Sequence, residues 1–210
     1  MAMDQLRIVI LVFPNIEELD FVGPYEVFTQ LGKIVDRGIV AGPRPVTRLI
    51  ARTLEPVTCA GGMRVLPDQS FADCDPADIL VVPGGQGTRP LASDAETLGV
   101  IARIGAEAKW VTSVCTGSAL LGAAGLLHGR SATTHWAAMD FLAAQAPATT
   151  IVRDRRVVVD GNIMTSAGVS AGIDMALLLT GRIYGPAAAK AVQKGMEYFP
   201  EPPYSDSAPV

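Results

Sequence analysis

Short apolar runs separated by longer helical patterns recur along most of this 210-residue chain. Two of the runs, 6–13 and 79–82, are nearly solid with Val, Ile and Leu. Such runs are typical of strands that are buried on both faces of a parallel sheet. Strands that alternate with helices in this way predict an α/β fold, in which helices cover both faces of a doubly wound, mostly parallel sheet.

The other elements follow from the same patterns. We expect strands at 46–51, 110–114, 132–134 and 163–166, hairpins at 56–66 and 151–159, and helices at 20–31, 94–108, 116–126, 139–144, 168–184 and 186–195. The second hairpin is expected to turn near Asp154. Residues 1–199 are expected to form a single domain, followed by a Pro- and Ser-rich surface tail over 200–210.

Charge and composition argue against several kinds of partner. Lys and Arg total 17 against 21 Asp and Glu, and there is no basic stripe. We therefore expect no nucleic-acid partner and no membrane binding. The uncharged window 110–127 holds too many Ser, Thr and Gly residues for a membrane span, so a soluble chain is expected. Three cysteines and the lack of a signal-peptide pattern favour a cytoplasmic location.

The strongest local signal is the segment Ser113-Val114-Cys115-Thr116-Gly117. It places a cysteine between an apolar strand and a helix, with small residues two positions away on each side, as in a nucleophile elbow. We expect the helix start to lower the pKa of the Cys115 thiol, and the Thr116 N–H to face a developing oxyanion. The alternative is a buried, inert cysteine, which is the interpretation we favour for Cys59 and Cys74.

A glycine-rich turn, 83–87, follows another buried strand. Its spacing fits neither the dinucleotide-binding fingerprint nor the P-loop. By itself it predicts only a tight turn. Beside Cys115, however, the N–H of Gly85 becomes a candidate for a second oxyanion donor, because a residue without a Cβ allows close approach to the backbone.

An acidic cluster follows the first strand. Asp20 is either the N-cap of the next helix or a partly buried, proton-bearing carboxyl group beside the thiol. Glu17 and Glu18 compete with Asp20 for the second role.

Two histidines are present, and neither is spaced from a cysteine or from the other histidine as metal ligands usually are. His128 is expected to be solvated. His135 follows a short strand, where it either faces the site or makes a polar core contact. Without a Cys–His cluster we expect no metal, and we expect no other cofactor.

Motifs spread over nearly the whole chain resemble the ThiJ/PfpI superfamily, which is flavodoxin-like and related to class I glutamine amidotransferases. The motifs that carry the resemblance are Leu19-Asp20 with Gly23-Pro24, 70–74, Pro83-Gly84-Gly85, 111–118, 122–127, 132–136, 171–174, Glu197-Tyr198 and 202–204. The resemblance implies that Cys115 is the nucleophile, that Thr116 supports it, and that Asp20 is the acidic partner where many members carry Glu. It also implies a homodimer with the site close to the interface.

The chain departs from two branches of the superfamily. The amidotransferases complete their triad with a late histidine, and 165–174 contains none. The branch associated with proteases has His after the cysteine, whereas this chain has Thr116. Glutaminase and peptidase activity are therefore not expected.

Within the superfamily, the chain resembles the branch that hydrates isonitriles. On this expectation a protonated Asp20 gives its proton to the isonitrile carbon while the Cys115 thiolate attacks, and the ionised carboxylate then activates water. Trp136, His135 and Val169 are the expected pocket wall. The alternatives are a glyoxalase or deglycase, and a non-catalytic module that senses redox state or a ligand. A transcription regulator is not expected, because the 15 residues after Gly195 are too few for a DNA-binding domain.

Overall fold

A mostly parallel sheet with helices on both faces forms the core of the molecule, and the computed structural model describes residues 5–200. The strands of this sheet are β1 (Gln5–Leu11), β2 (Arg44–Ala51), β5 (Gln69–Ser70), β6 (Ile79–Val82), β7 (Trp110–Val114), β10 (Val157–Asp160) and β11 (Ile163–Ser166). Two small two-stranded pairs join β3 (Val57–Thr58) to β4 (Arg64–Val65) and β8 (Ser131–Ala132) to β9 (Thr150–Ile151). The helices are α1 (Glu18–Asp36), α2 (Thr88–Leu91), α3 (Ala95–Glu107), α4 (Gly117–Ala123), α5 (Met139–Gln145), α6 (Ala171–Tyr184) and α7 (Pro186–Gly195), with a 3-10 turn, η1 (Trp136–Ala138).

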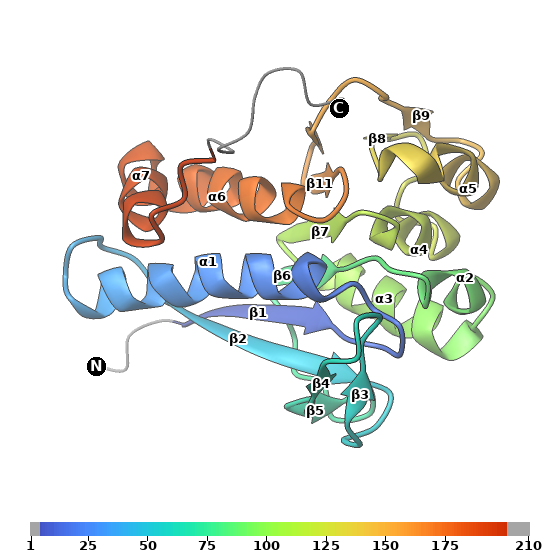
Figure 1. The fold of residues 1–210 in the computed structure, drawn as a ribbon, viewed down its shortest axis with the longest axis horizontal. Helices are drawn as coiled ribbons and strands as arrows, with labels where there is room; N and C mark the ends of the chain where they lie inside the picture. The colour runs from blue at the N-terminus through green and yellow to red at the C-terminus, as the bar shows by residue number, and fades with distance from the viewer. Residues whose placement is uncertain (1–4, 201–210) are drawn as a thin grey trace.

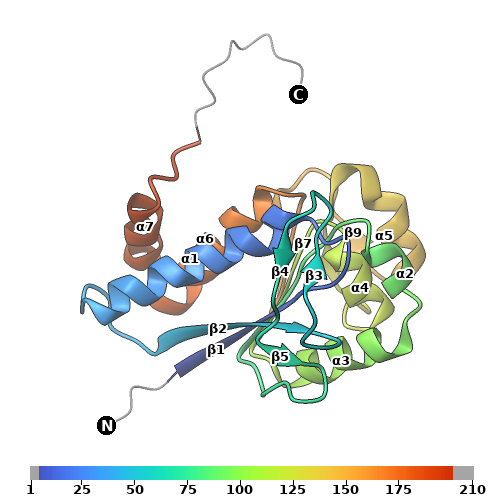
Figure 2. The same ribbon diagram turned by 60° about the horizontal axis from the view of Figure 1, so that its bottom comes forward.

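The strand order of the large sheet is β10-β11-β7-β6-β1-β2-β5. Its neighbouring strands are parallel, except for the antiparallel pair β10 and β11. The parallel strands β2, β1, β6, β7 and β11 therefore follow the 2-1-3-4-5 order of flavodoxin-like folds. Helices α1, α6 and α7 cover one face, and α3 and α4 cover the other (Figures 1 and 2). The α/β class expected from the sequence is confirmed.

The strands form where the sequence is most continuously apolar. All four residues of β6 are buried, as are the last four of β1. Because helices cover both faces of the sheet, neither side of these strands meets solvent, and their side chains are apolar on both sides. The bounds of β6, β7 and β11 therefore agree with the sequence prediction.

One hairpin prediction is wrong. The segment 151–159 does not fold back on itself near Asp154, because β9 pairs in parallel with β8 and β10 pairs with β11. The turn lies instead between β10 and β11, at Gly161, whose φ of 61° suits glycine. The two loop residues are Gly161 and Asn162, because Asp160 pairs with Ile163. A Gly-Asn pair between two apolar runs is itself a hairpin signal in the sequence. The hairpin predicted over 56–66 is confirmed as β3 and β4.

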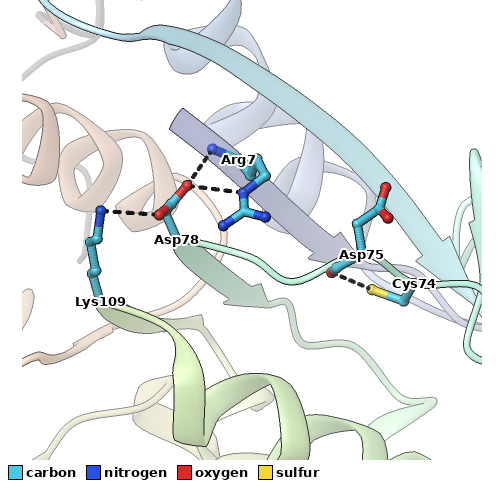
Figure 3. Close-up of polar contacts among 5 residues, drawn as sticks. All are labelled: Arg7, Cys74, Asp75, Asp78 and Lys109. Atoms are coloured by element: carbon cyan, nitrogen blue, oxygen red, sulfur yellow. Dashed lines mark hydrogen bonds and ion pairs between the residues drawn. The ribbon is translucent and has the colours of Figure 1, made fainter. Parts of the chain in front are cut away.

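The amino-terminal edge of the sheet is held by one carboxylate (Figure 3). Asp78, just before β6, accepts from the backbone N–H of Arg7 at 2.9 Å and forms an ion pair with Lys109 at 3.1 Å. These contacts connect β1, β6 and the start of β7. Nearby, the Cys74 thiol donates to the carbonyl oxygen of Asp75.

The opposite, carboxyl-terminal edge is where ligands bind in sheets of this kind. The loops that follow β1, β6 and β7 meet there. Within the described part of the chain, no helix is long and apolar enough to cross a membrane. Residues 201–210, where the sequence predicts a surface tail, lie outside the described residues.

Candidate active site

A strained turn between β7 and α4 presents the cysteine. Cys115 has a φ of 55°, which is uncommon for any residue other than glycine. Its N–H donates to the carbonyl oxygens of Ser166 and Ala167, and its own carbonyl oxygen accepts from the Thr134 hydroxyl at 2.8 Å. These bonds hold the strained conformation from two other segments of the chain. The predicted elbow is therefore present in the backbone.

The turn also depends on a close approach between two loops. A Cβ on Gly117 would lie 1.9 Å from the carbonyl oxygen of Val82, at the end of β6. Only glycine allows the start of α4 to pack this closely against the neighbouring strand. The small residue two positions after the cysteine therefore has a steric cause.

Asp20 lies beside the cysteine in the first turn of α1, and the N-cap of that helix is Glu17. Asp20 is the third residue of α1, it is fully buried, and its Oδ2 accepts from the Gly84 N–H at 2.9 Å. Its Oδ1 meets no donor of ordinary hydrogen-bond geometry among residues 5–200. Burial raises the pKa of Asp20 to about 7, against the lowering effect of the Gly84 N–H. The Asp20 carboxyl group therefore gains and loses its proton near neutral pH, and the N-cap alternative is wrong.

The other two acidic candidates are now distinguished from Asp20. Glu18 accepts from the N–H of Gly61 at 2.7 Å, which connects α1 to the turn between β3 and β4. Glu17 lines the cavity above the cysteine, and its negative charge adds to the rise in the pKa of Asp20.

The Cys115 thiol does not have the lowered pKa that we expected from the helix start. Burial, and then the charge of Asp20, raise the pKa of Cys115 to about 12. The N–H and hydroxyl of Thr116 act in the opposite direction and are outweighed. With its 7 residues, α4 is also a short helix and therefore a weak dipole. At neutral pH the resting group is a thiol beside a carboxyl group that is partly ionised.

A small hydrogen-bonded ring surrounds the Thr116 hydroxyl. The N–H of Gly85 donates to Thr116 Oγ1 at 3.0 Å, and Thr88 Oγ1 lies 3.0 Å from the same atom and 2.8 Å from the Gly85 carbonyl oxygen. Thr88 is fully buried. In this arrangement the Gly85 N–H is engaged by Thr116, so its direct effect is to orient that hydroxyl.

A cavity of about 210 Å³ opens above the cysteine. Its lining residues are Glu17, Ala60, Gly85, Gln86, Arg89, Cys115, Thr116, His135, Ala137, Ala138 and Val169. The structure thus brings Cys115, Thr116, Gly85, His135 and Val169 together, as the sequence predicts, with Asp20 buried beside the cysteine. Two larger cavities, of about 430 and 510 Å³, do not include the cysteine in their walls.

The three expected wall residues have different positions. The His135 Nδ1 accepts from the Ala137 N–H at 3.1 Å, so its neutral ring carries the proton on Nε2. Val169 has a φ of 51°, a strained value for a β-branched residue, and its backbone N–H lies near the Asp20 carboxyl. Trp136 is 80% exposed and lies outside the lining, because η1 turns its ring toward solvent, where it packs against His135.

The remaining cysteines are not activated. Burial raises the pKa of both the Cys59 and the Cys74 thiols. Among residues 5–200, no group of three or more His, Cys, Asp or Glu side chains is placed to hold a metal ion.

Sequence reasoning missed three contributors to the site. Thr88 and Arg89 belong to the short helix α2, which was not predicted, and Gly84 was treated only as part of a turn. The pattern of a buried strand, a glycine turn and a polar pair was visible in the sequence. Only the packing of α2 against α4, however, brings that pair to the cysteine.

The fold and these groups together define a class: a flavodoxin-like α/β protein with a cysteine–carboxyl site at the carboxyl edge of its sheet. Residues 6–181 match the DJ-1/PfpI family. The chain is 43% identical over 204 residues to the isonitrile hydratase of Pseudomonas putida, covering 97% of this chain and 83% of that protein. The chain therefore belongs to the DJ-1/PfpI family, and the resemblance found from its motifs is confirmed.

Solved structures agree with this assignment. A ThiJ/PfpI family protein from Pseudomonas syringae has a TM-score of 0.86 and 38% identity, covering 99% of this chain and 81% of that one. Drosophila melanogaster DJ-1beta has a TM-score of 0.79 at 23% identity, covering 93% of this chain and 98% of that one. At that identity the second likeness concerns the fold alone.

Proposed function

We propose that this protein is an isonitrile hydratase, a lyase that adds water to R–N≡C to give the N-substituted formamide R–NH–CHO. The observation that carries the proposal is the buried Asp20 carboxyl beside the Cys115 elbow, in a chain 43% identical to a protein of that activity. The reaction needs a nucleophile and one group that both gives and takes a proton. Asp20 and Cys115 are a pair of that kind.

The number of protons on this pair determines the first step. Because the pKa of Asp20 is about 7 and that of Cys115 about 12, the pair carries one proton between these values, on sulfur. The carboxylate of Asp20 takes this proton as the sulfur attacks the isonitrile carbon, and then delivers it to the same carbon. The product is a thioimidate, R–N=CH–S–Cys115, with Asp20 ionised again.

Water completes the reaction. Asp20 takes a proton from water while the hydroxide adds to the thioimidate carbon, and this proton passes to nitrogen to give R–NH–CH(OH)–S–Cys115. The C–S bond then breaks and the hydroxyl proton returns to sulfur through Asp20. The formamide leaves, and the pair again carries one proton. The N–H of Thr116 supports the sulfur as it becomes negative.

The cavity suits a small substrate with an apolar portion. Ala60, Ala137, Ala138 and Val169 form its apolar wall. We also propose, on the family resemblance, that the protein is a homodimer and acts in the cytoplasm with the isonitrile and water as its only reactants. No metal or other cofactor takes part in this scheme.

Formamide production from one alkyl and one aryl isonitrile tests the proposal. We expect many turnovers per chain in the wild type and in a Cys74→Ala control, and loss of at least about 1,000-fold in Cys115→Ala, as for the removal of a nucleophile. Absence of formamide above the uncatalysed rate would overturn the proposal. Assays with methylglyoxal and with peroxide then separate the glyoxalase and sensing alternatives.

The pH dependence of the same reaction tests the proton count. We expect kcat/KM to rise with pH through about 7, because the form with Asp20 ionised and Cys115 protonated is the reactive one. A rate that falls as pH rises through 7 would contradict the assignment of Asp20 as the initial base.

A further inference from the structure

The cavity above Cys115 contains one permanently charged cation among its lining residues, the guanidinium group of Arg89. Arg89 belongs to α2, the short helix that follows the glycine turn after β6. Its side chain is exposed at the cavity mouth. The catalytic scheme proposed above does not use this charge.

The Arg89 side chain is held in place without being neutralised. Its Nε donates to the Gln86 Oε1 at 3.0 Å, and its Cζ lies 4.9 Å from the centroid of the Phe141 ring. Neither contact uses the two terminal nitrogens. Among residues 5–200, no carboxylate lies within ion-pair distance of Arg89, whereas Arg44 and Arg52 each pair with an acidic side chain. The guanidinium is therefore oriented and retains free donors.

The negative charge in the cavity lies nearer the thiol. Glu17 also lines the cavity, and its charge contributes to the raised pKa of both Asp20 and Cys115. An anionic group on a bound molecule is thus repelled at the thiol end and attracted at the Arg89 end.

We propose that the site prefers isonitriles that carry a carboxylate group, and that Arg89 binds this group at the cavity mouth while the isonitrile carbon reaches Cys115. A guanidinium group matches a carboxylate with two parallel hydrogen bonds, which orients as well as attracts it. This inference rests on the proposed function, because it names the substrate class of the same site.

The first experiment compares an isonitrile acid with its methyl ester, for example 4-isocyanobenzoate and methyl 4-isocyanobenzoate. We expect the acid-to-ester ratio of kcat/KM to fall about fivefold in Arg89→Gln, mainly through KM, as for a partly exposed charge pair. Arg89→Lys keeps the charge but not the paired donors, so we expect an intermediate ratio. Arg48→Gln removes an exposed arginine of β2 without touching the cavity, and should keep the wild-type ratio.

A second experiment does not depend on hydration. The rate of alkylation at Cys115 is measured with 3-maleimidopropionate and with N-propylmaleimide, by mass spectrometry of the peptide that contains this cysteine. We expect the acid-to-neutral ratio to fall about fivefold in Arg89→Gln and to stay unchanged in Arg48→Gln.

The two experiments separate the two proposals. If no isonitrile is hydrated but the maleimide ratio falls in Arg89→Gln, the proposed function fails and Arg89 remains an anion-binding residue of the cavity. If the ratios of Arg89→Gln stay within about twofold of the wild type in both experiments, the inference about Arg89 is overturned.

Discussion

The buried carboxyl group of Asp20, which the proposed reaction uses as its acid and base, lowers the stability of the fold near neutral pH. Its pKa of about 7 results from burial, which disfavours the ionised form. In the unfolded chain the same group ionises near pH 4. The folded state therefore loses stability as pH rises from about 4 to about 7, because the unfolded state releases this proton first. Active-site groups often carry such a cost.

Replacement of Asp20 by Asn should abolish hydration while stabilising the fold. Asn keeps an acceptor for the Gly84 N–H and has no charge to bury. We expect a gain in the free energy of unfolding that grows between pH 5 and pH 8 by about 2 kcal/mol. Urea unfolding at the two pH values measures it, with Asp154→Asn, an exposed acid, as the control. An equal effect of Asp20→Asn at both pH values would contradict the raised pKa.

A second residue, Thr88, is expected to act on the proposed reaction through Thr116. In Thr88→Val the buried hydroxyl near Thr116 Oγ1 and the Gly85 carbonyl oxygen is lost with little change in volume. We expect kcat to fall about threefold to tenfold with KM nearly unchanged, because Thr116 loses one of the groups that orient it. Thr88→Ser keeps the hydroxyl group, so its kcat should be close to that of the wild type.

A matched control separates positioning from packing. The Thr112 hydroxyl is also buried and donates to the Leu80 carbonyl oxygen, away from the cavity. Thr112→Val should cost a similar stability, about 1 kcal/mol, and leave kcat unchanged. If both variants reduce kcat equally, Thr88 has no specific effect on the site.

At the scale of elements, the site depends on how closely the elbow approaches the end of β6. The loop after β6 supplies the Gly84 N–H to Asp20 and the Gly85 N–H to Thr116. The elbow after β7 supplies Cys115. Because these strands are neighbours, their loops meet at one edge of the sheet. The geometry of the site is therefore a consequence of strand order.

Gly117→Ala tests this close approach. The added Cβ would meet the Val82 carbonyl oxygen, so the start of α4 must move, and we expect a loss of about 3 kcal/mol in the free energy of unfolding together with a loss of activity. Gly99→Ala on α3 is the matched control, because nothing lies within 4 Å of its added Cβ. Helix propensity predicts a gain of about 0.5–1 kcal/mol there. Urea unfolding of the two variants measures the difference.

At the scale of the whole molecule, the candidate active site and the Asp78 cluster lie at opposite edges of one sheet. The carboxyl edge contains the strained turns, the buried acid and the cavity. The amino edge contains the Asp78 cluster that connects three segments (Figure 3). Burial raises the pKa of Asp78, but the Arg7 N–H and Lys109 outweigh it and hold that pKa below its ordinary value. Asp78 therefore stabilises the fold above about pH 4, and this contribution is lost as pH falls through the lowered pKa.

Asp78→Asn should lower the free energy of unfolding by about 1 kcal/mol at pH 7, since both cationic partners are largely exposed. The difference from the wild type should be smaller at pH 3 than at pH 7, because the contribution of the Asp78 carboxylate is lost as pH falls through its lowered pKa. Urea unfolding at both pH values tests this, and Lys109→Gln should show part of the same effect. A deficit that does not depend on pH would show that Asp78 acts through its shape rather than its charge.

Much of this molecule is determined locally by its sequence. Continuous apolar runs determine where β6 and β7 begin and end, because only a doubly covered strand tolerates them. The elbow at 113–117 is also visible in the sequence, because small residues flank the cysteine at the point where an apolar strand meets a helix. These are properties of a few consecutive residues, so pattern alone identifies them.

Other properties depend on residues that are far apart in the chain. The choice of Asp20 over Glu17 and Glu18 required α1 to be packed against the loop after β6. The raised pKa of the Cys115 thiol comes from burial by several elements, and it reversed the expectation drawn from the helix start. The parallel pairing of β9 with β8 and the exposure of Trp136 were likewise decided by tertiary packing. Desolvation of a side chain and the pairing of strands both depend on residues that are distant in the sequence. Only the folded chain therefore determines them.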